Sequence, residues 1–387
     1  MDFQFSPEEL ALQKEVRDFL KNEMPPQVPY EVEHEMGWEG PYTREFIKKL
    51  GAKHWLTASW PKEYGGLGAN YMQRYIIGEE LSAAGGTRTL IGATMAGPTI
   101  LLYGSEEQKK EYLPRIARGE IEFALGYTEP EAGSDMANLD IRAVEMDDHY
   151  LINGQKLFNT GCHYSDYHWL GARTDPKAPR HRGISLFIVD FKSPGISLDP
   201  IITMAGYRTN AVYYDNVRVP KKNMVGEKNK GWYHIATALD FERTYESGGI
   251  ERKFLSLVEY CRNTRRKGQP LTEDIEIRHK LSKLAVEIEV LKLFAVRLAC
   301  IINKGTVPNY EAAMAKLFGS ELEQRLSQTG MEILGLHCQL REGDQHAPMN
   351  GQMELYHRMT VRWTIVRGSS EIMRTLIATR GLGMPRS

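Results

Sequence analysis

The sequence predicts an α+β fold in three parts: an N-terminal helical domain (1–122), a central β domain (123–231) and a C-terminal helical bundle (232–387). Two observations support this division. The apolar residues follow a helical period at both ends of the chain and a period near two in the middle. The length of 387 residues also suffices for two or three domains.

Helical patterns occupy most of the N-terminal part. Ser6 has the character of an N-cap, with Glu9 three residues later, so a helix is expected to begin there. The segment EEQKKEYLPRIARGE (106–120) is also helical in pattern. Between these helices, WPKEYGGLG (60–68) is dense in turn residues and predicts a loop.

Three segments of the central part read as strands: HYLINGQKLF (149–158), GISLFIVDF (183–191) and AVYYDNVRVP (211–220). Turns are expected at Asn153-Gly154 and at Ser193-Pro194-Gly195. Helical periodicity then returns, most clearly in the run from 275 to 302. The stretch ALDFERTYESGG (238–249) is interpreted as one helix, although its two glycines lower helix propensity.

Composition excludes several classes of partner. The 49 Lys and Arg residues nearly balance the 50 Asp and Glu residues, so neither nucleic acid nor an anionic membrane is expected as a partner. The sequence has no apolar run of membrane-spanning length, and its N-terminus does not resemble a signal or transit peptide. Its four cysteines are scattered without metal-ligand spacing. A reduced, cytoplasmic enzyme without a bound metal is therefore predicted.

The common nucleotide and catalytic motifs are missing from the sequence. It contains no GxGxxG after a strand, no GxxxxGK[ST], no GxSxG and no HExxH. The informative segment is LGYTEPEAGSDMANLDIRA (125–143), in which a strand runs into a turn forced by Pro130 and Gly133. This turn would expose the hydroxyls of Thr128 and Ser134 with several backbone N–H groups, and it can bind a flat, carbonyl-rich ring or be an ordinary surface turn.

A longer series of motifs resembles the acyl-CoA dehydrogenase family in order and spacing across essentially the whole chain. The motifs are PKEYGGLG (61–68), YTEPEAGSD (127–135), NGQKxFxT (153–160), YSDYHWLGART (164–174), MxGxR (204–208), DNVRVP (215–220) and RGSSEIMR (367–374). The resemblance implies a helical domain, a barrel-like β domain and a four-helix bundle, usually in a tetramer. It also implies FAD, a CoA thioester substrate and electron-transfer flavoprotein as oxidant.

The resemblance assigns residues to ligands position by position. It gives the flavin Leu125, Tyr127, Thr128, Gly133, Ser134, Phe158, Thr160, Ser369 and Glu371. It gives the acyl-CoA substrate Ser134, Asp240, Arg243, Arg367 and Gly368.

Many family members carry the catalytic base as a Glu before a Gly-Thr near the C-terminus, but Arg367 stands at that place here. An arginine stays protonated and cannot accept the α-proton. Members resembling isovaleryl- and long-chain acyl-CoA dehydrogenases carry the base on a helix immediately before an Arg, and Glu242-Arg243 matches that placement. Glu242 is therefore the predicted general base, with Gly249 expected on the same helix face. Arg367 can either bind a substrate carboxylate or serve a structural role.

The family pattern breaks where each subunit completes its neighbour's flavin site. Homotetrameric members use an RxxFG segment, a Gln and a Gly-Gly-x-Gly loop. The corresponding positions here are Thr264, Lys267, Ile275, Leu336 and Cys338. The chain can therefore pair with a homologous subunit in an α2β2 assembly, or form a homotetramer in which Arg265, Arg266 and Lys267 replace the lost arginine.

The function expected from these motifs is FAD-dependent oxidation of a branched, alicyclic or bulky acyl-CoA to the trans-2-enoyl-CoA. It would serve fatty acid or lipid metabolism in a bacterium or archaeon. The alternative is a flavin-poor structural subunit of a heteromeric enzyme, which would scaffold its partner.

Overall fold

The computed structural model describes residues 4–87, 90–242 and 246–385, and the side chains of residues 237–242 lie outside that description. By its internal contacts the chain forms two compact units. Unit 1 comprises residues 1–20, 71–85 and 243–387, and unit 2 comprises residues 21–70 and 86–242. The predicted division into three domains stays a prediction.

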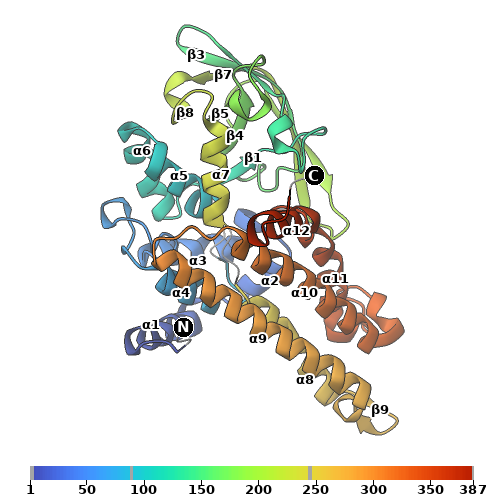
Figure 1. The fold of residues 1–387 in the computed structure, drawn as a ribbon. Helices are drawn as coiled ribbons and strands as arrows, with labels where there is room; N and C mark the ends of the chain where they lie inside the picture. Colours follow the sequence, from blue (N-terminus) through green and yellow to red (C-terminus); the bar gives the residue numbers. More distant parts are fainter. Residues whose placement is uncertain (1–3, 88–89, 243–245, 386–387) are drawn as a thin grey trace. The chain divides into compact units, whose positions relative to one another are not determined.

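Unit 2 is built on an eight-stranded sheet with the order β6-β7-β3-β2-β4-β5-β8, in which β1 pairs with β4 (Figure 1). Its strands are β1 (Phe123–Gly126), β2 (Arg142–Glu145), β3 (His149–Lys156), β4 (Tyr167–Arg173), β5 (Ile184–Asp190), β6 (Ile196–Ile202), β7 (Arg208–Pro220) and β8 (Met224–Val225). Strand β4 pairs in parallel with β1 and β2, and the other pairings are antiparallel.

The turn predicted at Asn153-Gly154 is wrong, because β3 continues through it. Instead, the register with β7 shifts between Ile152 and Gly154, which is a β-bulge. The Asn153 side chain accepts a hydrogen bond from the backbone N–H of Asn216 on β7, at 2.8 Å. Gly154 has φ 136°, and a Cβ there would lie 2.9 Å from Ile141. The Asn-Gly pair therefore bends a strand rather than reversing it. The turn predicted at residues 193–195 is confirmed between β5 and β6.

Unit 2 also contains several helices. They are α2 (Val28–Glu33), α3 (Pro41–Ala52), the π-helix η3 (Gly92–Ala96), α5 (Gly97–Tyr103), α6 (Glu106–Ala117) and α7 (Gly231–Glu242). Helix α6 begins with a capping box at Ser105 and Gln108. The Gln108 amide also donates to the carbonyls of Lys222 and Met224 at 2.7 and 2.9 Å, which ties α6 to the chain at β8.

Unit 1 joins helices from both ends of the chain. They are α1 (Pro7–Glu23, in unit 1 up to Leu20), α4 (Tyr71–Ala83), α8 (Gly248–Asn263), α9 (Ile275–Asn303), α10 (Tyr310–Leu334), α11 (Gln352–Trp363) and α12 (Ser370–Leu376). A short hairpin of β9 (Arg265–Arg266) and β10 (Gln269–Pro270) follows α8. The predicted cap of α1 is confirmed, since Ser6 and Glu9 exchange side-chain-to-backbone hydrogen bonds.

The predicted helical bundle is confirmed by one apolar core shared by α8, α9, α10 and α11. Helix α4 packs against both α8 and α9. A second cluster joins Met72 and Ile76 of α4 to Val296 and Ala299 of α9. In the part of the chain that the structure describes, no helix combines the length and apolar character needed to cross a membrane.

Candidate active site

The turn that follows β1 presents the first predicted site residues. Glu129 and Ala132 exchange backbone hydrogen bonds of 3.1 Å across the turn, and Leu157 N–H donates to the Thr128 carbonyl at 2.9 Å. Gly133 and Ser134 are exposed. A Cβ built on Gly133 meets no atom within 4 Å, so a ligand can approach the backbone closely here. Leu125 is half-buried on β1 and Tyr127 is buried.

Phe158 and Thr160 follow the end of β3. The Phe158 backbone has φ 56°, a left-handed conformation that costs a non-glycine residue about 1–3 kcal/mol. Neighbouring bonds hold this conformation: Asn159 N–H donates to the Asn210 carbonyl and the Asn210 amide donates to the Asn159 carbonyl, both at 2.9 Å. The Phe158 side chain is 60% exposed. The left-handed backbone conformation of Phe158 thus accompanies an aromatic ring that is exposed at the surface.

The two segments come together because their backbones are bonded to each other through Thr128 and Leu157. They combine the hydroxyls of Thr128, Ser134 and Thr160 with an exposed aromatic ring. Thr160 Oγ1 lies 3.1 Å from Thr209 Oγ1, which orients its hydroxyl. Hydroxyl and N–H donors beside an aromatic face fit a flat heterocycle with carbonyl and ring-nitrogen acceptors, such as a flavin.

A buried histidine lies on β4, the strand that pairs with β1. His168 is fully buried, and burial lowers its pKa to about 3, so its ring is uncharged. Its Nδ1 forms a short hydrogen bond with the Tyr214 hydroxyl. A Cβ on Gly126 would lie 2.5 Å from His168 Nε2, so only a glycine fits on the strand at that point.

Sequence reasoning missed a buried ion pair at this turn, between Glu129 and Lys156. Lys156 Nζ lies 2.8 Å from Glu129 Oε1, and the Lys156 side chain is fully buried. The available signal was a lysine at an inward position of an alternating strand, because such a lysine requires a buried partner.

The helix that carries the predicted base is α7, which packs on the sheet of unit 2. A Cβ on Gly231 would lie 2.6 Å from the Ser185 backbone of β5, so the helix starts in close contact with that strand. The His234 ring lies 4.2 Å from the Tyr103 ring of α5. Asp240 and Glu242 lie in the last turn of α7. Their side chains, and all of Arg243, lie outside the described residues.

The expectation that Gly249 shares a helix face with Glu242 is wrong. Helix α7 ends at Glu242, and a separate helix, α8, begins at Gly248. A Cβ on Gly248 would lie 2.5 Å from the Glu79 carbonyl of α4, and one on Gly249 would lie 3.0 Å from Ser82 Oγ. The two glycines therefore permit close packing of α8 on α4.

In unit 1, Arg367 and Gly368 form the turn between α11 and α12, with φ values of 58° and 89°. Lys316 of α10 holds this turn, since its Nζ donates to the carbonyls of Trp363 and Gly368 at 2.9 and 2.6 Å. Burial, followed by the nearby Arg367 charge, lowers the pKa of Lys316 to about 8. The Arg367 guanidinium lies 5.9 Å from the centre of the Trp363 ring.

The two predicted flavin residues of this region lie at the start of α12. Ser369 is the N-cap, and its hydroxyl accepts a hydrogen bond from Ile372 N–H at 3.4 Å. The pKa of Glu371 is lowered by backbone N–H bonding and by the Ser369 hydroxyl. The predicted residues thus form two groups, one within each unit.

The positions that depart from the family pattern lie around the β9–β10 hairpin and after α10. Lys267 and Gly268 form the hairpin turn, both with positive φ. Ile275 is 58% exposed and Leu336 is 86% exposed. Cys338 packs against the bundle core. Bulky apolar side chains therefore occupy surface positions where polar residues or glycines were expected.

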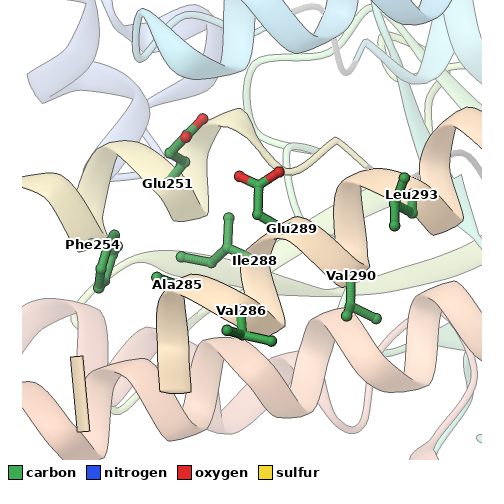
Figure 2. A pocket seen from close by; sticks show the side chains of 8 residues that line it. All are labelled: Glu251, Phe254, Ala285, Val286, Ile288, Glu289, Val290 and Leu293. Atoms are coloured by element: carbon green, nitrogen blue, oxygen red, sulfur yellow. The ribbon is translucent and has the colours of Figure 1, made fainter. Parts of the chain in front are cut away.

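An open apolar groove of about 350 Å³ lies between α8 and α9 (Figure 2). Phe254, Ile288 and Leu293 are among its lining residues. Lys292 joins Glu251 and Glu289 through ion pairs of 2.7 and 2.9 Å. Among the predicted site residues whose side chains the structure describes, none lines this groove.

Comparison with known proteins assigns all three parts of the chain. Residues 6–120, 124–217 and 229–382 match the N-terminal, middle and C-terminal domains of acyl-CoA dehydrogenase. The chain is 37% identical over 399 residues to acyl-CoA dehydrogenase FadE26 of Mycobacterium tuberculosis, with both chains fully covered.

Two solved structures with similar chains are complexes of two named components. The chain is similar to one in the Tcur3481–Tcur3483 steroid ACAD, with 36% identity and a TM-score of 0.92. It is also similar to one in the ChsE4–ChsE5 complex from Mycobacterium tuberculosis, with 37% identity and a TM-score of 0.91. Each comparison covers the whole of both chains.

Proposed function

Because the chain belongs to the acyl-CoA dehydrogenase family, we propose that it forms the α,β double bond of a branched, alicyclic or bulky acyl-CoA. Members of this family are FAD-dependent oxidoreductases that act on CH–CH bonds. The observation that carries the proposal is the pair of bonded segments at 128–134 and 158–160, which fits a flavin ring. The similarity to a steroid ACAD supports a bulky acyl group.

In the proposed reaction Glu242 accepts the α-proton of the thioester. When bound, FAD supplies the acceptor for the β-hydride. The α-proton is weakly acidic, so the carboxylate must act in a site that excludes water. Hydrogen bonds to the thioester oxygen must stabilise the charge that develops there. Asp240 and Arg243 are proposed to contact the acyl-CoA, together with Ser134, Arg367 and Gly368.

We further propose that a homologous subunit completes the flavin site in an α2β2 assembly, with electron-transfer flavoprotein as the oxidant. Similarity to chains from two-component complexes supports this arrangement. The competing proposal is a flavin-poor structural subunit. Flavin absorbance is measured for the chain purified alone and with its partner. Substitution of Thr128 or Thr160 then separates the two proposals, because in a purely structural subunit neither substitution would alter the flavin spectrum.

The test of the base is Glu242→Gln in the flavin-loaded complex, mixed anaerobically with a panel of acyl-CoA thioesters. The wild type should bleach its flavin with bulky acyl groups. The variant should still bind FAD and acyl-CoA but lose about 10²–10⁴-fold or more in the bleaching rate, because an amide cannot accept the α-proton. The exposed Glu227 serves as a matched control, and Glu227→Gln should bleach normally. Retention of more than about a tenth of the wild-type rate would refute Glu242 as the base, since it is far above that expected loss.

A further inference from the structure

The Glu129 carboxylate is the central anchor of the turn that follows β1. Its Oε2 accepts a hydrogen bond from Asp140 N–H at 2.6 Å, and its Oε1 accepts one from Ile141 N–H at 3.1 Å. Lys156 Nζ completes the set at 2.8 Å. One buried carboxylate thus joins the turn to the chain before β2 and to the end of β3.

Lys156 links this anchor to the backbone that bears the predicted flavin residues. Its Nζ also donates to the Tyr127 carbonyl at 3.0 Å, directly before Thr128. Lys156 is also the last residue of β3, one residue before Leu157, which bonds to Thr128. The same ammonium group therefore holds both segments of the candidate flavin site.

The Glu129–Lys156 pair has no net charge, but both of its charged groups are buried away from solvent. Lys156 has no exposed surface, and burial lowers its pKa to about 8 against the opposing effect of Glu129. Two other charges lie nearby. Arg173 donates to the carbonyls of Leu139 and Ala137 at 2.9 Å, and its charge acts on both Lys156 and Glu129. Arg142 pairs with Asp140 at 2.6 Å. Removing either charge of the pair would change the net charge here by one unit in a medium that screens weakly.

We infer that Glu129 and Lys156 are positioning residues that preorganise the flavin-binding turn and, by cancelling each other's charge, set the reduction potential of the bound flavin. This inference rests on the proposed placement of the flavin at this turn. Reduction adds negative charge to the ring, so excess positive charge behind the turn favours the reduced form and excess negative charge opposes it.

The experiment measures the flavin midpoint potential of the loaded complex by spectroelectrochemical titration. At a pH low enough to keep Lys156 protonated, Glu129→Gln removes the negative charge and should raise the potential. Lys156→Met removes the positive charge and should lower it. The double variant Glu129→Gln/Lys156→Met is neutral again and should return close to the wild type. Glu145→Gln is the matched control. Glu145 lies on β2 and forms exposed ion pairs with Lys221 and Lys228, so its substitution removes the same charge and should leave the potential unchanged.

A second measurement separates the role of Glu129 in holding the turn from the effect of its charge on the potential. It does not require the Lys156→Met variant to fold. Glu129→Asp keeps the charge but shortens the side chain, so apo-complex titrated with FAD should bind at least about tenfold more weakly with an unchanged potential. Shifts of the same sign in both single variants, or none larger than in Glu145→Gln, would overturn the inference.

Thr160→Val tests the placement of the flavin itself. If that substitution changes FAD affinity or the flavin spectrum while the Glu129 and Lys156 variants do not, only the inference fails. If neither Thr160→Val nor the Glu129 and Lys156 variants change FAD affinity or the flavin spectrum, the proposed flavin site fails as well.

Discussion

The resemblance to the family places Arg367 where many members carry their catalytic carboxylate, and a second cation, Lys316, contacts the same turn. It occupies a left-handed turn whose carbonyls are held by the buried ammonium of Lys316. Arg367 and the Lys316 ammonium, from α10, place two cations at this turn, which favours an anionic ligand. A substrate carboxylate, carried on the acyl group, is the ligand that the planar guanidinium fork would suit.

Arg367→Ala should therefore discriminate between substrates. We expect KM for a dicarboxylic acyl-CoA to rise about ten- to a hundredfold, with little change for a neutral acyl-CoA of equal size, because only the first loses a charge-assisted hydrogen bond. Steady-state kinetics with both substrates check this. Arg362→Ala is the control, since its guanidinium lies 4.1 Å from the centre of the same Trp363 ring, on α11. Equal effects on both substrates would make Arg367 a structural residue.

At the scale of elements, patterns of apolar residues predicted the strands at 149–158, 183–191 and 211–220 to within a few residues. They also predicted the long helix from 275. Local periodicity suffices for these because each buries a regular face. It failed at Asn153-Gly154, where the pairing with β7 decides between a turn and a bulge. It also could not find the Glu129–Lys156 pair, since a partner 27 residues away is fixed only by tertiary structure.

The start of α8 at Gly248 was likewise invisible in the sequence, and contacts from the distant helix α4 hold it. Glu79 of α4 accepts hydrogen bonds from Ser247 N–H and Ser247 Oγ at 2.8 and 2.5 Å. Ser82 Oγ accepts one from Gly249 N–H at 2.9 Å. Burial, the largest effect, raises the pKa of Glu79 from 4.5 to about 6, although the Ser247 bonds oppose it.

This shift predicts an unusual pH dependence of stability. Between pH 4.5 and 6 the folded chain binds a proton at Glu79 that the unfolded chain has released, so stability falls as the pH rises through this window. A shift of this size corresponds to about 2 kcal/mol. Glu79→Gln should remove this pH dependence. The free energy of unfolding of the variant should therefore lie further below that of the wild type at pH 4.5 than at pH 7, by about 2 kcal/mol.

Urea unfolding of the two proteins at several pH values measures that difference. Ser247→Ala is the companion variant: it removes a donor that favours the charged carboxylate, so it should enlarge the pH dependence that Glu79→Gln removes. A difference between wild type and Glu79→Gln that is constant from pH 4.5 to 7 would contradict the assignment.

At the scale of the whole molecule, the hairpin after α8 bears on assembly. Arg265 Nη1 donates to the Gly268 carbonyl at 3.1 Å, and Arg266 Nη2 donates to the Ile333 carbonyl at 3.2 Å. Both guanidinium groups are thus engaged within their own chain. The proposal that the chain does not lend a cation to a neighbour's flavin diphosphate, whose buried charge would need one, rests on the departures from the family pattern at Thr264 and Lys267.

Co-expression with a homologue that retains an RxxFG segment should therefore give a heterotetramer with about one flavin per two chains, a closed symmetric assembly. Native mass and the ratio of flavin absorbance to protein measure this. Restoring the pattern by Thr264→Arg, Lys267→Phe, Ile275→Gln, Leu336→Gly and Cys338→Gly together should raise the flavin content of the chain purified alone. A homotetramer of the natural chain with a full flavin per subunit would refute the proposal.

The bonds between Glu79 and Ser247 also constrain how the protein is made. The two residues are 168 positions apart, so α4 leaves the ribosome long before α8 exists to cover it. At ~5–20 residues per second this interval lasts roughly 8–34 s. During it the apolar face of α4 that bears Met72 and Ile76 has no α9 to pack against, while residues 86–242 of unit 2 are synthesised. Newly made chains should therefore depend on chaperones until α9 emerges, and a fragment that begins at α8 should not fold without α4.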